Sequence, residues 1–147
     1  MPAQTANMTH FLLVEDDDDH ANLFEMSMSK LGHTSTITRM PNGLEAMKYL
    51  TKEAPYEDSK RPDVILLDLN MPYMSGHQVI AEINAKQELH GIPIVIVSTS
   101  QADEDRRKAY EAHASSYVVK PIDFSKFQSM VTDLENFWSE WNQPGPA

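Results

Sequence analysis

The sequence predicts an α/β domain whose core is a doubly wound parallel sheet. Short uninterrupted apolar runs alternate five times with segments whose apolar residues recur at helical spacing. Strands that are apolar throughout are typical of parallel sheets covered by helices on both faces. Acidic, hydroxyl or basic side chains directly follow most of these runs. Because right-handed crossovers bring all strand C-termini to one edge, we expect these polar side chains to lie together there.

The expected strands are short and rich in β-branched and other aliphatic residues. The predicted strands are residues 11–14, 34–38, 64–67, 94–97 and 117–119. Prolines at the entry to the third and fourth runs mark where those strands begin.

Helices are expected after each strand. Gly32 is placed to end the first helix, Asn42 to begin the second, and Gly76 precedes the third. Residues 102–113 predict a mostly polar fourth helix, and a long final helix is expected from about residue 123 to residue 141.

The composition predicts one domain in a reducing compartment. The chain has 147 residues, of which 41% are hydrophobic, enough for one core. A net charge of −10 argues against nucleic acid as a partner, and the absence of cysteine excludes disulfides and thiolate metal sites. No apolar run approaches the roughly 20 residues of a membrane span, and no signal peptide is recognisable. We therefore expect a cytoplasmic domain over residues 9–141, with a flexible arm over residues 1–8 and a flexible tail over residues 142–147.

Polar side chains suited to phosphoryl chemistry follow four of the apolar runs. Glu15 and Asp16 follow the first run, Asp68 the third, Ser98 the fourth and Lys120 the fifth. Carboxylates held close together repel one another, and an oxygen-binding cation such as Mg²⁺ relieves that repulsion. With a metal and a lysine nearby, Asp68 is a candidate nucleophile toward a phosphoryl group. Ser98 and Lys120 are candidates to contact the phosphoryl oxygens.

Each of these residues also has an ordinary structural interpretation. Residues 17–19 are expected to cap a helix, and for Asp16 capping and metal binding have equal support. Asp68 alone would more often be a turn residue, and His20 is expected to be an exposed helix residue rather than a metal ligand. The functional interpretation is favoured because all four sets of residues fall at strand C-termini in a compatible order.

Together these motifs resemble the response-regulator receiver family of two-component signalling. The resemblance covers nearly the whole chain, from residue 10 to about residue 138. Its motifs are residues 12–16, 64–72, Gly76, 94–98 and 117–121. It implies a flavodoxin-like (βα)₅ fold, with five parallel strands in the order 2-1-3-4-5.

The resemblance also implies roles for individual residues. Asp68 matches the phosphoacceptor, and Glu15 and Asp16 match the acidic pair that binds Mg²⁺ with it. Asn70 matches the position whose backbone carbonyl binds the same metal. Asn70 and Ser100 also match the positions that set the rate of autodephosphorylation. The extra acids after Asp16 leave the exact metal ligands open.

The remaining implied roles concern the switch. Ser98 matches the hydroxyl that moves toward the phosphoryl group, and Tyr117 matches the aromatic residue whose rotamer follows it. Lys120 matches the lysine that pairs with the phosphoryl group. The resemblance further implies a cis peptide bond between Lys120 and Pro121.

A closer resemblance is to cyanobacterial phytochrome-associated regulators of the Rcp type. It rests on residues 98–100, 110–114, 117–123 and 134–138. It implies a phytochrome-like sensor histidine kinase as the phosphoryl donor and a homodimer formed through the last helix.

Three aromatic residues near the end of the last helix are candidates for that dimer contact. Phe137, Trp138 and Trp141 lie beyond the usual end of a receiver's final helix. Exposed apolar patches often mark association sites, so dimerisation is one interpretation. Packing against their own domain is the other.

We expect a single-domain response regulator that is not an enzyme in the usual sense and that signals to a downstream protein or phosphorelay. One alternative is a pseudo-receiver, an interaction module that does not need phosphorylation, although both Asp68 and Lys120 are retained. Another is a phosphatase of the haloacid dehalogenase type. Such an enzyme needs a second acid two residues after its nucleophile, where this chain has Asn70.

Overall fold

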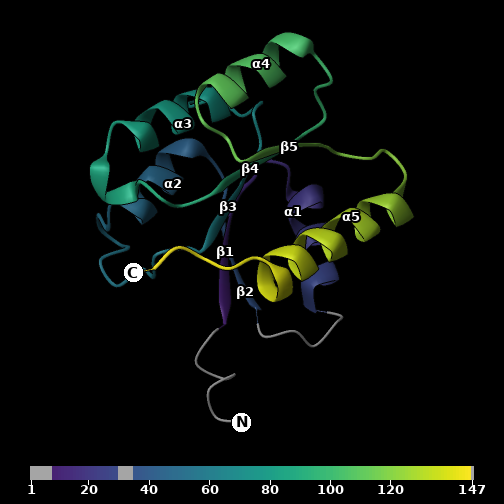
Figure 1. The fold of residues 1–147 in the computed structure, drawn as a ribbon, viewed down its shortest axis with the longest axis horizontal. Coiled ribbons are helices and arrows are strands. Elements are labelled where there is room, and N and C mark those ends of the chain that lie inside the picture. Colours follow the sequence, from purple (N-terminus) through teal and green to yellow (C-terminus); the bar gives the residue numbers. More distant parts are fainter. Residues whose placement is uncertain (1–7, 30–34, 147) are drawn as a thin grey trace.

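The computed structural model describes residues 8–29 and 35–146 and consists of one sheet between two layers of helices (Figure 1). The strands are β1 (Thr9–Val14), β2 (Ser35–Met40), β3 (Val64–Leu67), β4 (Ile94–Ser98) and β5 (Ser116–Val119). The helices are α1 (Asp18–Ser29), α2 (Gly43–Leu50), α3 (Gly76–Asn84), α4 (Asp103–Glu111) and α5 (Phe124–Asn136). Two short turns are also helical, the 3₁₀ turn η2 (Gln87–Leu89) and the π-helical turn η3 (Phe137–Trp141).

All five strands are parallel and follow the order β2-β1-β3-β4-β5. The predicted flavodoxin-like fold and strand order are therefore confirmed. In Figure 1, α1 and α5 cover one face of the sheet, while α2, α3 and α4 lie on the other. Successive strand residues point to opposite faces, so Leu12 and Val14 join the core under α2–α4, and Phe11 and Leu13 join the core under α1 and α5.

Side-chain caps explain where three of the helices begin. Asn42 accepts a hydrogen bond from the Glu45 amide at the start of α2, as its position in the sequence predicted. Ser75 and Gln78 form a reciprocal capping box at the start of α3. Asp123 accepts from the Lys126 amide at the start of α5. The predicted cap at Gly32 lies outside the described residues.

The prediction of a cis bond between Lys120 and Pro121 is wrong. Among the described residues, the cis peptide bond is the one between Ala54 and Pro55. The trans isomer is the ordinary state of a bond that precedes proline. In this arrangement the Lys120 amide donates to the Ser98 carbonyl at 2.8 Å, which extends the pairing of β5 with β4.

The ends of the chain are described only in part. Residues 1–7 lie outside the described residues, and residues 142–146 contain no helix or strand. Within the described ranges, no helix is long and apolar enough to cross a membrane.

Candidate functional site

Three carboxylates meet at the C-terminal edge of the sheet. Val14 of β1 is paired with Leu67 of β3, so the residues that follow these two positions lie side by side. Glu15, Asp16 and Asp68 each offer an oxygen within 4.8 Å of the others. Glu15 and Asp68 are only 1% and 7% exposed, whereas Asp16 is open to solvent.

The ammonium group of Lys120 reaches the same cluster from the end of β5. Its Nζ lies 2.5 Å from Glu15 Oε1 and 3.6 Å from Asp68 Oδ2. Lys120 is itself buried, so solvent screens these charges weakly. The structure therefore brings together the predicted acceptor, the predicted acidic pair and the predicted lysine.

Burial dominates the electrostatics of Glu15. It raises the pKa of this carboxyl to about 7, against the opposing effect of the hydrogen bond from Lys120. The neighbouring charge of Asp68 also raises the pKa. Lys120 pairs with two of the three carboxylates, Glu15 and Asp68. The donor set of carboxylate oxygens is the kind that hard divalent cations such as Mg²⁺ bind.

Ser98 and Tyr117 are joined through one intervening residue. The buried Ser98 hydroxyl accepts a hydrogen bond from the Ser100 amide at 3.1 Å. The Tyr117 hydroxyl donates to the Ser100 carbonyl at 3.0 Å. The two predicted switch residues therefore both contact Ser100.

Gly76 fixes the path of the chain behind Asp68. A Cβ atom at Gly76 would lie 2.4 Å from the Asp68 carbonyl oxygen and 2.7 Å from Leu69 Cα. Only glycine allows the start of α3 to approach the acceptor this closely. Asn70 lies exposed in the same loop, and its predicted role at the metal stays a prediction.

Two residues contact the site that were not predicted to do so. His20 is not the exposed helix residue that was expected: it is half-buried, and its Nδ1 lies 3.0 Å from Lys120 Nζ. Arg39 on β2 donates from Nε to the Glu15 carbonyl at 2.9 Å and pairs with Asp18. The contact of Arg39 could have been found from the pairing of β2 with β1, which places Arg39 beside the end of β1 and the acidic residues that follow it.

The capping role predicted for the acids after Asp16 holds for Asp17. Its Oδ1 accepts hydrogen bonds from the amides of Asp19 and His20, which begins α1. These contacts lower the pKa of Asp17, with the backbone hydrogen bond from His20 as the largest cause.

The aromatic residues at the end of the chain divide into two groups. Phe137 and Trp141 are 50% and 72% exposed. Trp138 instead packs against the core cluster under α1 and α5, and its ring meets that of Phe137 edge to face at 5.2 Å. Self-packing therefore describes Trp138, while Phe137 and Trp141 remain available at the surface.

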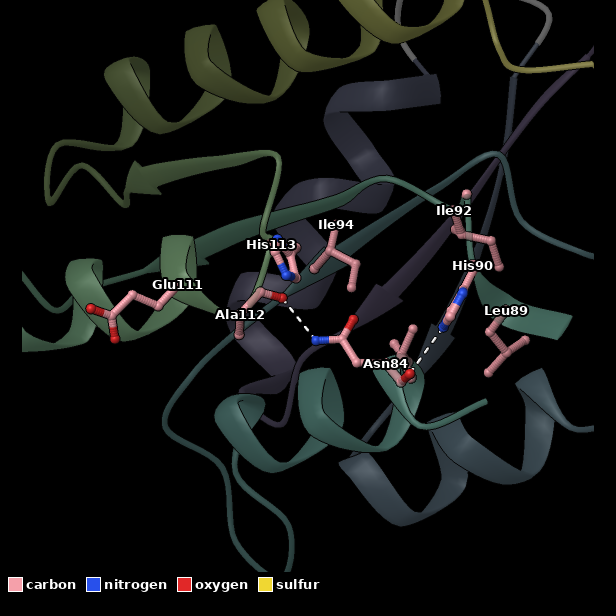
Figure 2. Close-up of a pocket in the computed structure, with 10 residues that line it drawn as sticks. Asn84, Leu89, His90, Ile92, Ile94, Glu111, Ala112 and His113 are labelled. Carbon is pink, nitrogen blue, oxygen red and sulfur yellow. Dashed lines mark hydrogen bonds between the residues drawn. The ribbon is translucent and has the colours of Figure 1, made fainter. Parts of the chain in front are cut away.

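A cavity of about 570 Å³ lies away from this site, between the C-terminal ends of α3 and α4 (Figure 2). Its lining includes none of the predicted site residues. Beside it, the Asn84 side-chain amide donates to the Ala112 carbonyl at 2.9 Å, which joins the two helix ends.

Comparisons with known proteins agree with the observed fold. The family model for the response regulator receiver domain matches residues 11–132. Response regulator Rcp1 of Synechocystis sp. is 38% identical, over 88% of both chains. The probable methanogenesis regulatory protein FilR2 of Methanothrix harundinacea is also 38% identical, over 92% of this chain and 88% of that protein.

Solved structures give the same result. The Mn²⁺-bound form of Rcp1 has a TM-score of 0.89 at 33% identity and covers 94% of this chain and 99% of its own. The phosphorylated cyanobacterial phytochrome response regulator RcpA has a TM-score of 0.90 at 32% identity, over 95% and 99% of the two chains. The resemblance to Rcp-type regulators is thereby confirmed, and the chain belongs to the response regulator receiver domain family.

Proposed function

We propose that this protein is a phosphorylation switch that accepts a phosphoryl group on Asp68 from the phosphohistidine of a phytochrome-type sensor kinase. One observation carries the proposal: Asp68 lies among Glu15, Asp16 and Lys120, with the carboxylate oxygens within 4.8 Å of one another and the ammonium 3.6 Å away. The similarity to Rcp1 and to the phytochrome response regulator RcpA supports the choice of kinase.

The transfer needs little covalent chemistry from the protein. An Asp68 carboxylate oxygen attacks the phosphorus, an O–P bond forms, and the N–P bond to the donor histidine breaks. The departing imidazole keeps the electron pair and takes a proton from solvent. Positioning and charge neutralisation supply most of the catalysis of such a step, so the receiver promotes its own phosphorylation.

Glu15, Asp16, Asp68 and the backbone carbonyl of Asn70 would hold Mg²⁺. When bound, the cation supplies positive charge beside the transferred oxygens. The acidic donor set fits such a cation, and the Mn²⁺-bound form of the similar Rcp1 supports a divalent site. Lys120 neutralises part of the charge of these carboxylates through its contact with Glu15.

The new phosphoryl group changes the contacts of the switch residues. Lys120 pairs with a phosphoryl oxygen in place of Glu15. The Ser98 hydroxyl leaves the Ser100 amide and donates to another oxygen, and the rotamer of Tyr117 follows that move. A ligand shifts such an equilibrium only through contacts that differ between the two states, and the contacts of Ser98 and Lys120 are the ones that would differ.

The output is a protein contact or a phosphorelay in the cytoplasm. The surface from residue 100 to residue 120 changes shape with the switch, and Phe137 and Trp141 supply an exposed apolar contact for a homodimer. Asn70 and Ser100 tune the rate of autodephosphorylation.

The test uses a cyanobacterial phytochrome histidine kinase that carries a radioactive phosphoryl group on its histidine. The label is expected to move to the wild-type protein in the presence of Mg²⁺ and not to Asp68→Asn. If the label moved from a histidine kinase that is not a phytochrome but not from the phytochrome kinase, Asp68 would remain the proposed acceptor and the choice of donor would be overturned. Equal labelling of Asp68→Asn would overturn the acceptor.

A further inference from the structure

The side chain of His20 reaches the acceptor site through Lys120. Its Nδ1 lies 3.0 Å from Lys120 Nζ. Because an ammonium group can only donate hydrogen bonds, Nδ1 is the acceptor and the ring proton is on Nε2. The Asp17 carboxylate lies 3.9 Å from the same Nδ1, which is too far for a hydrogen bond. His20 therefore gives Lys120 a neutral acceptor beside the charged one that Glu15 supplies.

The ammonium group of Lys120 has three N–H donors, and two of them are engaged. Glu15 Oε1 accepts at 2.5 Å and His20 Nδ1 accepts at 3.0 Å. Within the part of the chain that the structure describes, the other oxygen paired with Nζ is Asp68 Oδ2 at 3.6 Å, which is longer than a hydrogen bond. Two donors held in this way leave the third for an oxygen of a phosphoryl group on Asp68.

The position of His20 is fixed by its own contacts. Its amide donates to Asp17 Oδ1 at 3.1 Å, at the start of α1. Its ring centroid lies 5.4 Å from that of Phe127 on α5, with the two planes inclined at 38°. Phe127 is buried and meets the buried ring of Phe24 edge to face at 5.5 Å. A row of packed rings thus leads from the core under α1 and α5 to the lysine.

The two acceptors of Lys120 differ in what else they contact. Glu15 is also a candidate metal ligand, so a bound cation and the ammonium would share its oxygens. Its carboxylate also offsets the positive charge that the lysine would bring to a phosphoryl group. The neutral imidazole of His20 lies outside the carboxylate cluster and holds the ammonium without neutralising it. Since lysine carries a point charge on a flexible stem, a fixed neutral acceptor limits where that charge can lie.

We propose that His20 is a positioning residue that holds the ammonium of Lys120 beside Asp68 and thereby favours its contact with a phosphoryl group there. This inference rests on the proposed function and assigns a further residue to the same site. When Lys120 exchanges Glu15 for a phosphoryl oxygen, its contact with His20 can persist, because it uses a different N–H. Part of the side-chain entropy that the lysine must lose is therefore lost before the phosphoryl group arrives.

Two substitutions separate the acceptor of His20 from the packing of its ring. His20→Phe keeps a ring against Phe127 but has no acceptor. His20→Asn loses the ring but carries an amide oxygen as many bonds from the backbone as Nδ1. If the acceptor positions Lys120, His20→Phe weakens the contact with a phosphoryl group and His20→Asn preserves it. If only the packing of the ring matters, the order of the two variants is reversed.

The experiment measures the affinity of the full chain for beryllofluoride, a phosphoryl mimic, with saturating Mg²⁺. We expect the affinity of His20→Phe to fall about two- to tenfold, the range for failing to order one long side chain in advance, and that of His20→Asn to stay close to wild type. Urea unfolding should rank the two variants in the opposite order, because His20→Asn loses the ring contact. His90→Phe is the matched control, since it makes the same change in an imidazole that lines the distant cavity of Figure 2.

A second measurement follows the two side chains directly. With ¹⁵N-labelled histidine, NMR should show Nδ1 of His20 without a proton in both the unliganded and the mimic-bound protein. With labelled lysine, the side chain of Lys120 should be more mobile in His20→Phe than in wild type or His20→Asn. A change in packing alone would not produce this order.

Each outcome supports or overturns the role of His20. Affinity of His20→Phe equal to that of His90→Phe would overturn the role and leave the phosphorylation switch intact. An equal loss in His20→Asn would assign the effect to packing. Tighter binding by His20→Phe, or a proton on Nδ1, would overturn the role as well, because His20 would then compete for the ammonium or not accept from it. Failure of the wild type to bind the mimic would overturn the proposed function and this inference with it.

Discussion

The ammonium of Lys120 lies 2.5 Å from Glu15 Oε1 but 3.6 Å from Asp68 Oδ2. The lysine that the switch would offer to a phosphoryl group is thus closer to Glu15, which follows β1, than to the acceptor Asp68. A phosphoryl group on Asp68 would compete with Glu15 for this ammonium.

This pairing predicts a large effect on stability when Lys120 is removed. Lys120→Ala leaves Glu15 buried without its cation, which costs about 3–5 kcal/mol of unfolding free energy. Urea unfolding in the presence of a chelator measures the loss. The double variant Glu15→Gln/Lys120→Met should recover part of it, because the charge of Glu15 is then removed together with that of Lys120. A loss no larger than that of the exposed Lys126→Ala would contradict the account.

A second prediction concerns Gly76. In Gly76→Ala the new methyl group meets the Asp68 carbonyl and the Leu69 backbone, neither of which is a flexible side-chain end. Overpacking of this kind costs about 1–3 kcal/mol, and the acceptor is displaced as well. Gly145→Ala is the control, because nothing lies within 4 Å of its new Cβ. Urea unfolding and the phosphorylation rate of both variants check this, and equal behaviour of the two would refute it.

The pH dependence of stability is predicted from His10. Its Nε2 lies 2.8 Å from the Tyr49 hydroxyl and its Nδ1 lies 2.8 Å from the Thr36 hydroxyl. Tyr49 donates its own proton to the Lys60 carbonyl, so it accepts from Nε2, and the neutral ring is fully paired. Burial, followed by the charge of Lys60, lowers the pKa of His10 below 6.5, against the effect of Asp63.

The sign follows from which state binds more protons. Below pH 6.5 the unfolded chain protonates this histidine before the folded protein does. The contribution of His10 is therefore complete above pH 6.5 and declines as the pH falls toward its folded-state pKa. The difference in unfolding free energy between wild type and His10→Gln should increase with pH across this window. A difference that is constant with pH would show that His10 does not titrate as described.

The exposed aromatic residues of η3 predict the oligomeric state. Replacing Phe137 and Trp141 together by serine should convert a dimer to a monomer in light scattering without loss of helix content. Tyr73→Ser is the control, since it removes an 82% exposed aromatic from a different surface. A wild type that is monomeric at every concentration tested, or a double variant that remains dimeric, would exclude this contact.

Much of the fold was predictable because the physical signals are local. Runs such as residues 64–67 are apolar without interruption, which indicates a strand buried on both faces, and the structure has β3 at the same residues. The meeting of Glu15, Asp68 and Lys120 was predictable as well, because parallel strands end at one edge.

Other features depend on tertiary packing that the sequence does not encode locally. His20 meets Lys120 where the lysine side chain reaches the acidic cluster, and the contact joins residues 100 positions apart. The link from His77 to Asp105 spans 28 positions and depends on how α4 lies against α3. The difference in burial between Trp138 and its exposed neighbours Phe137 and Trp141 likewise follows from how the last turn packs.

The central claim is tested most directly by intact mass after incubation with acetyl phosphate, a small-molecule phosphoryl donor. With Mg²⁺, the wild-type protein should gain the mass of one phosphoryl group. With a chelator, or in Asp68→Asn, that gain should disappear. No gain in the wild type would favour a pseudo-receiver, and an equal gain in Asp68→Asn would show that Asp68 is not the acceptor.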